Sequence, residues 1–316
     1  MKISFVIPCY RSEKTIEGVI NEIKDVMNQR PEHCFEVICV NDCSPDDVLS
    51  VLKKLAADDD RVKVVNFARN FGKASAVLAG CKCVSGDVVV SLDDDGQCPV
   101  DKTWDLVDSL SEENVDMAMA DYPKKKESLF KRFGSKVNDS VMRMLIYQPK
   151  DVVMNNFFAM KRFVSDEITR YVNPYPALHP LILQATHNIK MVKMEERERA
   201  DDKSSGFTFM KSFMLMINGF TNFSVRPLRL ASILGTLVAL CGFVYGIITI
   251  VRRVMDPQMS AGYASMMAVI LFIGGVIMLL LGMIGEYIGR IYICINNAPQ
   301  YIVKERINMG TDNEIR

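Results

Sequence analysis

Four short apolar segments near the start of the chain alternate with segments whose apolar residues recur at helical spacing. The four are nearly uninterrupted apolar runs, rich in β-branched residues, at Ile3–Ile7, Phe35–Val40, Val62–Phe67 and Val88–Leu92. Such runs predict strands that are buried on both faces. Because helical segments such as Ile16–Val26 join the strands by short connections, the pattern predicts an α/β domain: a mostly parallel sheet covered by helices on both faces.

Two longer apolar stretches occur near the other end of the chain, at Ala231–Val251 and Ala264–Gly285. Each runs for about 21 or 22 residues without a charge, which is enough to cross a hydrocarbon layer of about 30 Å. Basic residues flank the outer ends of this hairpin at Arg226, Arg229, Arg290, Lys304 and Arg306, against Arg252 and Arg253 in its turn. This bias predicts that both termini lie in the cytosol. Glycines in both stretches permit close helix packing, so we expect a homo-oligomer.

The resulting division places a cytosolic catalytic domain at 1–225, a transmembrane hairpin at 226–292 and a cytosolic tail at 293–316. Two segments of the first domain, 128–147 and 207–224, are predicted to be membrane-facing helices. In the first of them, apolar residues recur every three or four positions with Lys and Arg between them. Such a helix either packs on the sheet or lies among lipid headgroups. The first residues, MKISFVIPCY, do not resemble a signal peptide, so the catalytic domain is expected to stay in the cytosol.

Composition narrows the function classes. Lys plus Arg and Asp plus Glu both total 38, so no net charge favours nucleic acid as a partner. Neither G-x-G-x-x-G after the first strand nor G-x-x-x-x-G-K-[ST] occurs, which disfavours dinucleotide oxidoreductases and P-loop NTPases. The nine cysteines are scattered singly apart from one C-x-C, so we expect free thiols.

Polar side chains follow each of the four predicted strands. They are Tyr10 and Glu13, then Asp42, then Arg69 and Lys73, and finally Asp93 and Asp95. The carboxyl ends of parallel strands lie along one edge of a sheet, so these side chains should line one crevice. Carboxylates with two cations suit a nucleotide diphosphate bound through Mg²⁺ or Mn²⁺. The alternative for the DDDG sequence after the fourth strand is an acidic turn with solvated charges.

Four blocks of the sequence resemble family 2 glycosyltransferases, which have the GT-A fold, a Rossmann-like α/β domain with a mostly parallel sheet. The blocks are FVIPCYRSEKTI, VICVNDCSPDD, ARNFGKASAVLAG and GDVVVSLDDDGQCP. The resemblance is closest to the polyprenyl-phosphate glycosyltransferases, meaning dolichol-phosphate mannosyltransferase and its bacterial relatives. The segment GEYIGRIY at the end of the second apolar stretch resembles the exit of that family's hairpin.

The resemblance implies roles for the residues of the crevice. The family's fourth block usually reads D-A-D-x-Q, which assigns the metal and the catalytic diphosphate site to Asp93, Asp95 and Gln97. Asp94 stands where alanine is usual, so Asp94→Ala is expected to be mild. The nucleotide sugar is expected to contact Pro8, Tyr10, Glu13, Asp42, Arg69, Lys73 and Asp94, with Asp42 at the base and ribose.

Two later blocks depart from the family pattern. Relatives commonly carry G-D-F-R-L with an acidic residue proposed to assist the acceptor, whereas this chain has Asn155, Asn156 and Phe158 at those positions. A lipid monophosphate is largely dianionic at neutral pH and needs positioning more than deprotonation. A charged segment at Glu195–Phe209 resembles the family's mobile loop, which closes over the sugar nucleotide. The resemblance implies that the acceptor phosphate or this loop's closure involves Asn156, Arg197, Arg199, Lys203 and Ser205. The alternative for that segment is a solvated loop.

The sequence therefore predicts an inverting, metal-dependent glycosyltransferase. It would move a sugar from a nucleotide sugar, with UDP favoured over GDP, to undecaprenyl or another polyprenyl phosphate, for use in modifying cell-envelope glycans. The expected location is the bacterial inner membrane, as a multi-pass protein. A processive polysaccharide synthase would show Q-x-x-R-W and more spans, whereas the single tryptophan is Trp104 in DKTWDLV. A membrane adaptor on a degenerate transferase fold is the remaining alternative.

Overall fold

The computed structural model describes residues 1–123, 149, 152–197, 262–296 and 298–309, with isolated positions between 235 and 255. It forms two compact units, one of Met1–Gly206 with Asn297–Arg316 and one of Phe207–Asn296. The two predicted membrane-facing helices lie outside the described residues. So do most of the first predicted span and the site candidates Arg199, Lys203 and Ser205.

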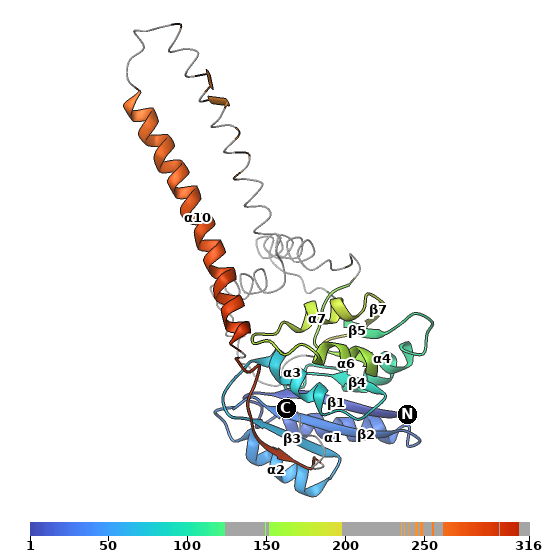
Figure 1. The fold of residues 1–316 in the computed structure, drawn as a ribbon. Helices are drawn as coiled ribbons and strands as arrows, with labels where there is room; N and C mark the ends of the chain where they lie inside the picture. The colour runs from blue at the N-terminus through green and yellow to red at the C-terminus, as the bar shows by residue number, and fades with distance from the viewer. Residues whose placement is uncertain are drawn as a thin grey trace. The chain divides into compact units, whose positions relative to one another are not determined.

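The first unit is built on one eight-stranded sheet with the order β7-β5-β6-β4-β1-β2-β3-β8 (Figure 1). Its strands are β1 (Lys2–Cys9), β2 (Cys34–Asn41), β3 (Val62–Phe67), β4 (Val88–Ser91), β5 (Met117–Asp121), β6 (Phe158–Lys161), β7 (Ile189–Lys193) and β8 (Val303–Ile307). β6 is antiparallel to β4 and β5, and β8 is antiparallel to β3, while the other pairs are parallel. The predicted mostly parallel α/β sheet is confirmed.

Helices cover both faces of this sheet. They are α1 (Ile16–Asn28), α2 (Val48–Asp58), α3 (Lys73–Lys82), α4 (Thr103–Ser109), α6 (Arg162–Thr169) and α7 (Leu178–Ala185), with a short 3₁₀ helix, η1, at Val100–Lys102. The apolar residues of α1, α2 and α4 share one buried core with Phe5 of β1. Val6 faces the other way, because successive strand residues point to opposite faces, and it lies against α3. A Cβ at Gly80 would overlap the Val6 side chain, so α3 can lie directly on β1 only with glycine there.

β1 continues through Pro8 to Cys9, two residues beyond the end expected from the sequence. The pairing of β1 with β4 ends at Val6↔Ser91, while its pairing with β2 continues to Cys9↔Asn41. Past Val6 the strand therefore has a paired neighbour on one side only. A residue without an N–H is tolerated in that setting.

The last strand, β8, was not expected. The sequence suggested a tail at 293–316, whereas Val303–Ile307 forms an antiparallel edge strand on β3. Its residues VKERI alternate, and the burial follows that alternation, with Val303, Glu305 and Ile307 partly buried. Five residues of this kind are too short a signal to distinguish a strand from a tail without a partner strand in view.

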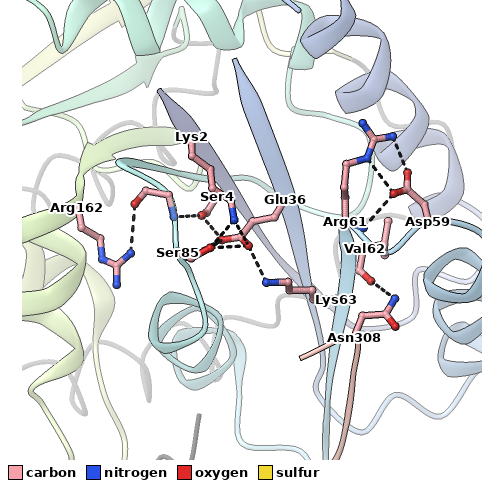
Figure 2. A network of polar contacts seen from close by, with 11 residues as sticks. Lys2, Ser4, Glu36, Asp59, Arg61, Val62, Lys63, Ser85, Arg162 and Asn308 are labelled. Carbon is pink, nitrogen blue, oxygen red and sulfur yellow. Dashed lines mark hydrogen bonds and ion pairs between the residues drawn. The ribbon is translucent and has the colours of Figure 1, made fainter. Parts of the chain in front are cut away.

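A buried carboxylate ties together the edge of the sheet where its parallel strands begin. Glu36 is 2% exposed and accepts hydrogen bonds from Ser4 Oγ (2.6 Å), the Ser85 N–H (2.6 Å) and Lys63 Nζ (2.8 Å) (Figure 2). Burial alone would raise its pKa, but these bonds and that from Lys2 outweigh burial and lower the pKa to about 2. The network therefore joins β1, β2, β3 and the loop before β4 at the edge opposite the predicted site.

The second unit contains α10 (Tyr263–Ile295). This helix includes the second predicted span and continues beyond it through GEYIGRIYICI. Its stretch Phe272–Ile295 has 24 residues and a mean hydropathy of 1.9, so it is long and apolar enough to cross a membrane.

Candidate active site

The loops after β1 and β4 are joined by hydrogen bonds to Asp94. Its Oδ2 accepts the Tyr10 N–H (2.8 Å), and its main-chain oxygen accepts Thr15 Oγ1 (2.6 Å). Burial raises the pKa of the Asp94 carboxyl to about 6, against the lowering effect of the Tyr10 N–H. Asp94 thus holds the first-strand loop against the acidic loop, a role that the resemblance did not suggest.

The loops after β1 and β2 are also joined. The Arg11 N–H donates to Ser44 Oγ (2.7 Å), and the Asp47 N–H donates to Glu13 Oε2 (3.4 Å). Arg11 (φ 61°) and Cys43 (φ 51°) adopt the left-handed backbone conformation that residues other than glycine seldom take. Tyr10 is 44% exposed beside them. Strained backbone of this kind persists where surrounding contacts impose it, often at a site.

Asp42 shapes the loop that follows β3. It is 4% exposed, and its two carboxylate oxygens accept the N–H groups of Phe71 (2.7 Å) and Gly72 (2.8 Å). Burial raises the pKa of this carboxyl, while the two N–H groups oppose the rise. Arg69 lies in this loop and Lys73 begins α3 directly after it, so Asp42 fixes the segment that carries both candidate cations. Its expected contact with base and ribose stays a prediction.

Three predicted site residues meet at one carboxylate. Lys73 Nζ donates to Asp93 Oδ1, and Asn156 Nδ2 donates to Asp93 Oδ2 over 3.3 Å. They come from the start of α3, the loop after β4 and the segment before β6. The topology thus brings together residues that are far apart in sequence, at the edge where the sequence places the crevice.

The loop after β4 continues past Asp94 in a tight turn at residues 95–97. The Gln97 N–H donates to Asp95 Oδ1 (3.1 Å), and Gly96 between them has φ 76°, which glycine adopts without strain. The Gln97 carbonyl accepts the Arg197 N–H (3.1 Å), so the charged segment after β7 begins beside this turn. The Arg197 guanidinium pairs with Glu22 (2.8 Å) and Asp101 (2.5 Å). Its expected phosphate contact stays a prediction.

The donor set of this loop suits a hard divalent cation. Asp93 and Asp95 offer carboxylate oxygens and Gln97 an amide oxygen, the ligands that Mg²⁺ and Mn²⁺ prefer. Within the described part of the chain, no group of three or more His, Cys, Asp and Glu side chains is arranged around a possible metal position. A cation held here would therefore need further oxygens, and a substrate diphosphate can supply them.

His179, in the first turn of α7, is a neighbour of the site that the sequence did not single out. Burial lowers the pKa of its imidazole to about 4, and the nearby charge of Lys73 lowers it as well. A hydrogen bond with the Asn155 main chain partly opposes this by raising the pKa. The ring is therefore uncharged at neutral pH. A single histidine between apolar residues carries no sequence signal for this placement.

The comparisons with known proteins agree with this geometry. A family model described as glycosyl transferase family 2 matches residues 4–169. The chain belongs to glycosyltransferase family 2. A second model, the GtrB C-terminal hairpin, matches residues 226–291. Together they confirm the expected GT-A-type transferase of the polyprenyl-phosphate class, and the hairpin match with the length of α10 indicates membrane association.

Known relatives match this chain over nearly its whole length. An SfII prophage-derived bactoprenol glucosyl transferase of Shigella flexneri is 31% identical over 308 residues, covering 96% of this chain and 98% of its own. An uncharacterized glycosyltransferase of Bacillus subtilis, YkcC, is 29% identical over 314 residues, covering 99% and 96%. The solved mannosyl-3-phosphoglycerate synthase of Rubrobacter xylanophilus has a TM-score of 0.49 and 18% identity, covering 72% of this chain and 74% of its own.

Proposed function

We propose that this glycosyltransferase moves glucose from UDP-glucose to undecaprenyl phosphate, or a similar polyprenyl phosphate, with inversion at the anomeric carbon. The observation that carries the proposal is the meeting of Lys73 and Asn156 at Asp93, beside the Asp95–Gln97 turn. Cationic and amide groups around carboxylates at strand ends suit a nucleotide diphosphate. The glucosyl group and the lipid acceptor are supported by relatives named bactoprenol glucosyl transferases.

In the proposed reaction, an oxygen of the lipid phosphate attacks the anomeric carbon of glucose. The bond between that carbon and the β-phosphate oxygen breaks, and UDP leaves with the electron pair. Arg69 and Lys73 would hold the diphosphate. The lipid phosphate is largely dianionic at neutral pH, so it requires no general base. Asn156 in place of the acidic residue common in relatives is consistent with this requirement.

Asp93, Asp95 and Gln97 would hold Mg²⁺ or Mn²⁺. A bound divalent cation would neutralise the charge that develops on the leaving diphosphate. Asn156 and Lys73 orient the Asp93 carboxylate through its two oxygens, and the Gln97 N–H orients that of Asp95 (3.1 Å). This chain's part in the reaction is therefore positioning and charge neutralisation, the main terms when the nucleophile needs no activation.

The test is a transfer assay with the full chain in membranes, undecaprenyl phosphate and radiolabelled sugar donors. UDP-glucose should give a labelled lipid, in preference to UDP-galactose, UDP-N-acetylglucosamine, an aminoarabinose donor and GDP-mannose. EDTA should stop transfer, and Mg²⁺ or Mn²⁺ should restore it. Asp95→Ala should abolish transfer, whereas Asp108→Asn, which alters a surface pair with Arg30 (2.6 Å), should not. No lipid product with any donor would favour the adaptor alternative.

We further infer that the chain crosses the bacterial plasma membrane twice, with the catalytic unit in the cytosol, and forms a homo-oligomer. The hairpin match at 226–291 and the apolar stretch of α10 support the spans, and the flanking basic residues support the orientation. Light scattering of the detergent-solubilised protein tests the oligomer, which a monomer mass would contradict. Labelling of single cysteines placed at 258 and 314 tests the orientation, because only the first should react from outside.

A further inference from the structure

Residues 300–302, which we call the anchor segment, directly precede β8 and belong to the first compact unit. Gln300 is 7% exposed, and its amide nitrogen donates to the main-chain oxygens of Tyr171 (3.0 Å) and Asn173 (3.2 Å). The Ile302 carbonyl accepts the Ala68 N–H (2.9 Å), one residue past the end of β3. The anchor segment is thus fixed at the start of the loop that carries Arg69 and leads to Lys73.

The middle residue of the anchor segment stacks on the last residue of β3. The rings of Tyr301 and Phe67 lie nearly parallel, at 11°, with centroids 5.2 Å apart. Phe67 is 1% exposed, so its ring has little freedom to move. The β3–β8 register also shifts between Asn66 and Phe67. Irregularities of this kind redirect the side chain that follows them.

The Phe67 ring also contacts the segment that carries the proposed nucleotide-sugar site, which we call the donor site. It meets the ring of Phe71 edge-on, with centroids 5.7 Å apart at 86°. The Arg69 guanidinium lies over the Phe71 ring, 4.7 Å from its centroid, and the Phe71 N–H donates to Asp42 Oδ1 (2.7 Å). A continuous series of rings therefore joins Tyr301 to the loop that carries Arg69 and leads to Lys73.

We propose that Tyr301 is a positioning residue for the donor site, acting through Phe67 and Phe71 on Arg69 and Lys73 without touching the substrate. The proposal rests on the proposed function in one respect, that these two cations bind the donor diphosphate. Groups held in their binding positions before the ligand arrives lose less freedom on binding. Loss of the Tyr301 ring should therefore weaken donor binding and leave the acceptor site unchanged.

The experiment compares Tyr301→Leu with Tyr301→Phe in the full chain, with UDP-glucose and undecaprenyl phosphate as substrates. Tyr301→Leu should raise KM for UDP-glucose about three- to tenfold, as expected for the loss of one aromatic pair. KM for undecaprenyl phosphate and kcat should stay within about twofold of wild type. Tyr301→Phe keeps the stacked ring and should leave the KM for UDP-glucose at the wild-type value.

Asn308→Ala is the matched control at the other end of β8. Its amide nitrogen donates to the Val62 carbonyl (2.9 Å), where β3 begins. That variant should lower the unfolding temperature without a change in donor KM. An equal rise in donor KM for Asn308→Ala and Tyr301→Leu would overturn the proposal, because β8 would then act only on stability. An unchanged donor KM in Tyr301→Leu would overturn it as well.

A second readout needs no substrate. Limited trypsin digestion followed by mass spectrometry reports how firmly the loop is held, because Arg69 and Lys73 are themselves cleavage sites. Tyr301→Leu should speed cleavage after these residues several-fold over wild type, Tyr301→Phe and Asn308→Ala. Equal rates would overturn the positioning role even if another nucleotide sugar proved to be the donor. Failure of wild-type glucosyl transfer would count against the proposed function alone.

Discussion

The side-chain amide of Asn156 donates to Asp93 Oδ2 over 3.3 Å, while Lys73 contacts the other oxygen of the same carboxylate. Asn156 thus orients a proposed metal ligand, at a position where the family resemblance led us to expect an acidic residue.

Asn156→Ala should lower kcat/KM about three- to tenfold, the cost of one lost hydrogen bond. Asn156→Asp should lower it further, because it places a second carboxylate beside Asp93. Steady-state glucosyl transfer at pH 7.5 measures both. Asn188→Ala, which removes a hydrogen bond to Asp116 (3.0 Å) at the opposite edge of the sheet, is the control. Higher activity in Asn156→Asp would show that a general base is useful at this position.

Asp94→Ala should be more harmful than the family resemblance led us to expect. The substitution removes the hydrogen bond from the Tyr10 N–H (2.8 Å), and a typical hydrogen bond contributes about 0.5–1.5 kcal/mol. We expect a lower unfolding temperature and a higher KM for the nucleotide sugar. Asp94→Asn keeps an oxygen acceptor and should behave nearly as wild type. If Asp94→Ala changed neither stability nor KM, the Tyr10 contact would be unimportant, and the mild effect expected from the sequence would hold.

Variants of Arg197 and its ion-pair partners separate a structural role of Arg197 from contact with the substrate phosphate. Its guanidinium pairs with Glu22 (2.8 Å) and Asp101 (2.5 Å). If these pairs only fasten the start of the charged segment, Arg197→Ala and the double variant Glu22→Ala/Asp101→Ala should raise donor KM equally, by about two- to fivefold, as expected of partly exposed ion pairs. If Arg197 turns to the substrate phosphate, Arg197→Ala should be at least about tenfold more damaging than the double variant. Steady-state kinetics decide between them.

Glu36→Gln should lower stability in a pH-dependent way. The pKa of Glu36 is lowered to about 2 in the folded chain from 4.5, because the bonds from Lys63, Ser4, Ser85 and Lys2 outweigh burial. A lowered pKa stabilises the fold above pH 4.5, and the contribution is lost as the pH falls toward 2. The variant should therefore lose about 3 kcal/mol near pH 7 and progressively less below pH 4.5.

Denaturant unfolding of the two proteins between pH 3 and pH 7 measures this difference. Glu113→Gln, in the exposed turn before β5, should show no such pH dependence. Glucosyl transfer by folded Glu36→Gln should match wild type, because Glu36 lies at the edge away from the strand ends that carry the site. A difference between wild type and Glu36→Gln that does not change with pH would contradict the assignment.

Local patterns were enough to predict the central strands and the acidic loop. Apolar runs such as Val88–Leu92 are nearly uninterrupted, and a polar residue follows each of them. In a parallel sheet these ends share one edge, so Lys73 and Asp93 were expected in one crevice before their contact was seen. The lone His179 could not be predicted in the same way, because it reaches the site through the packing of α7.

The sequence by itself determined the kind of protein: strand periodicity, the charge-free stretches and the spacing of Asp93, Asp95 and Gln97 are all local properties of the chain. Only the tertiary structure decided which partner each side chain meets. In the structure, Asp94 accepts a hydrogen bond from the Tyr10 N–H, β8 pairs with β3, and Tyr301 stacks on Phe67. Contacts of this kind join residues far apart in the sequence, such as Phe67 and Tyr301, which are 234 positions apart. Their energies depend on a distance in space that no local pattern encodes.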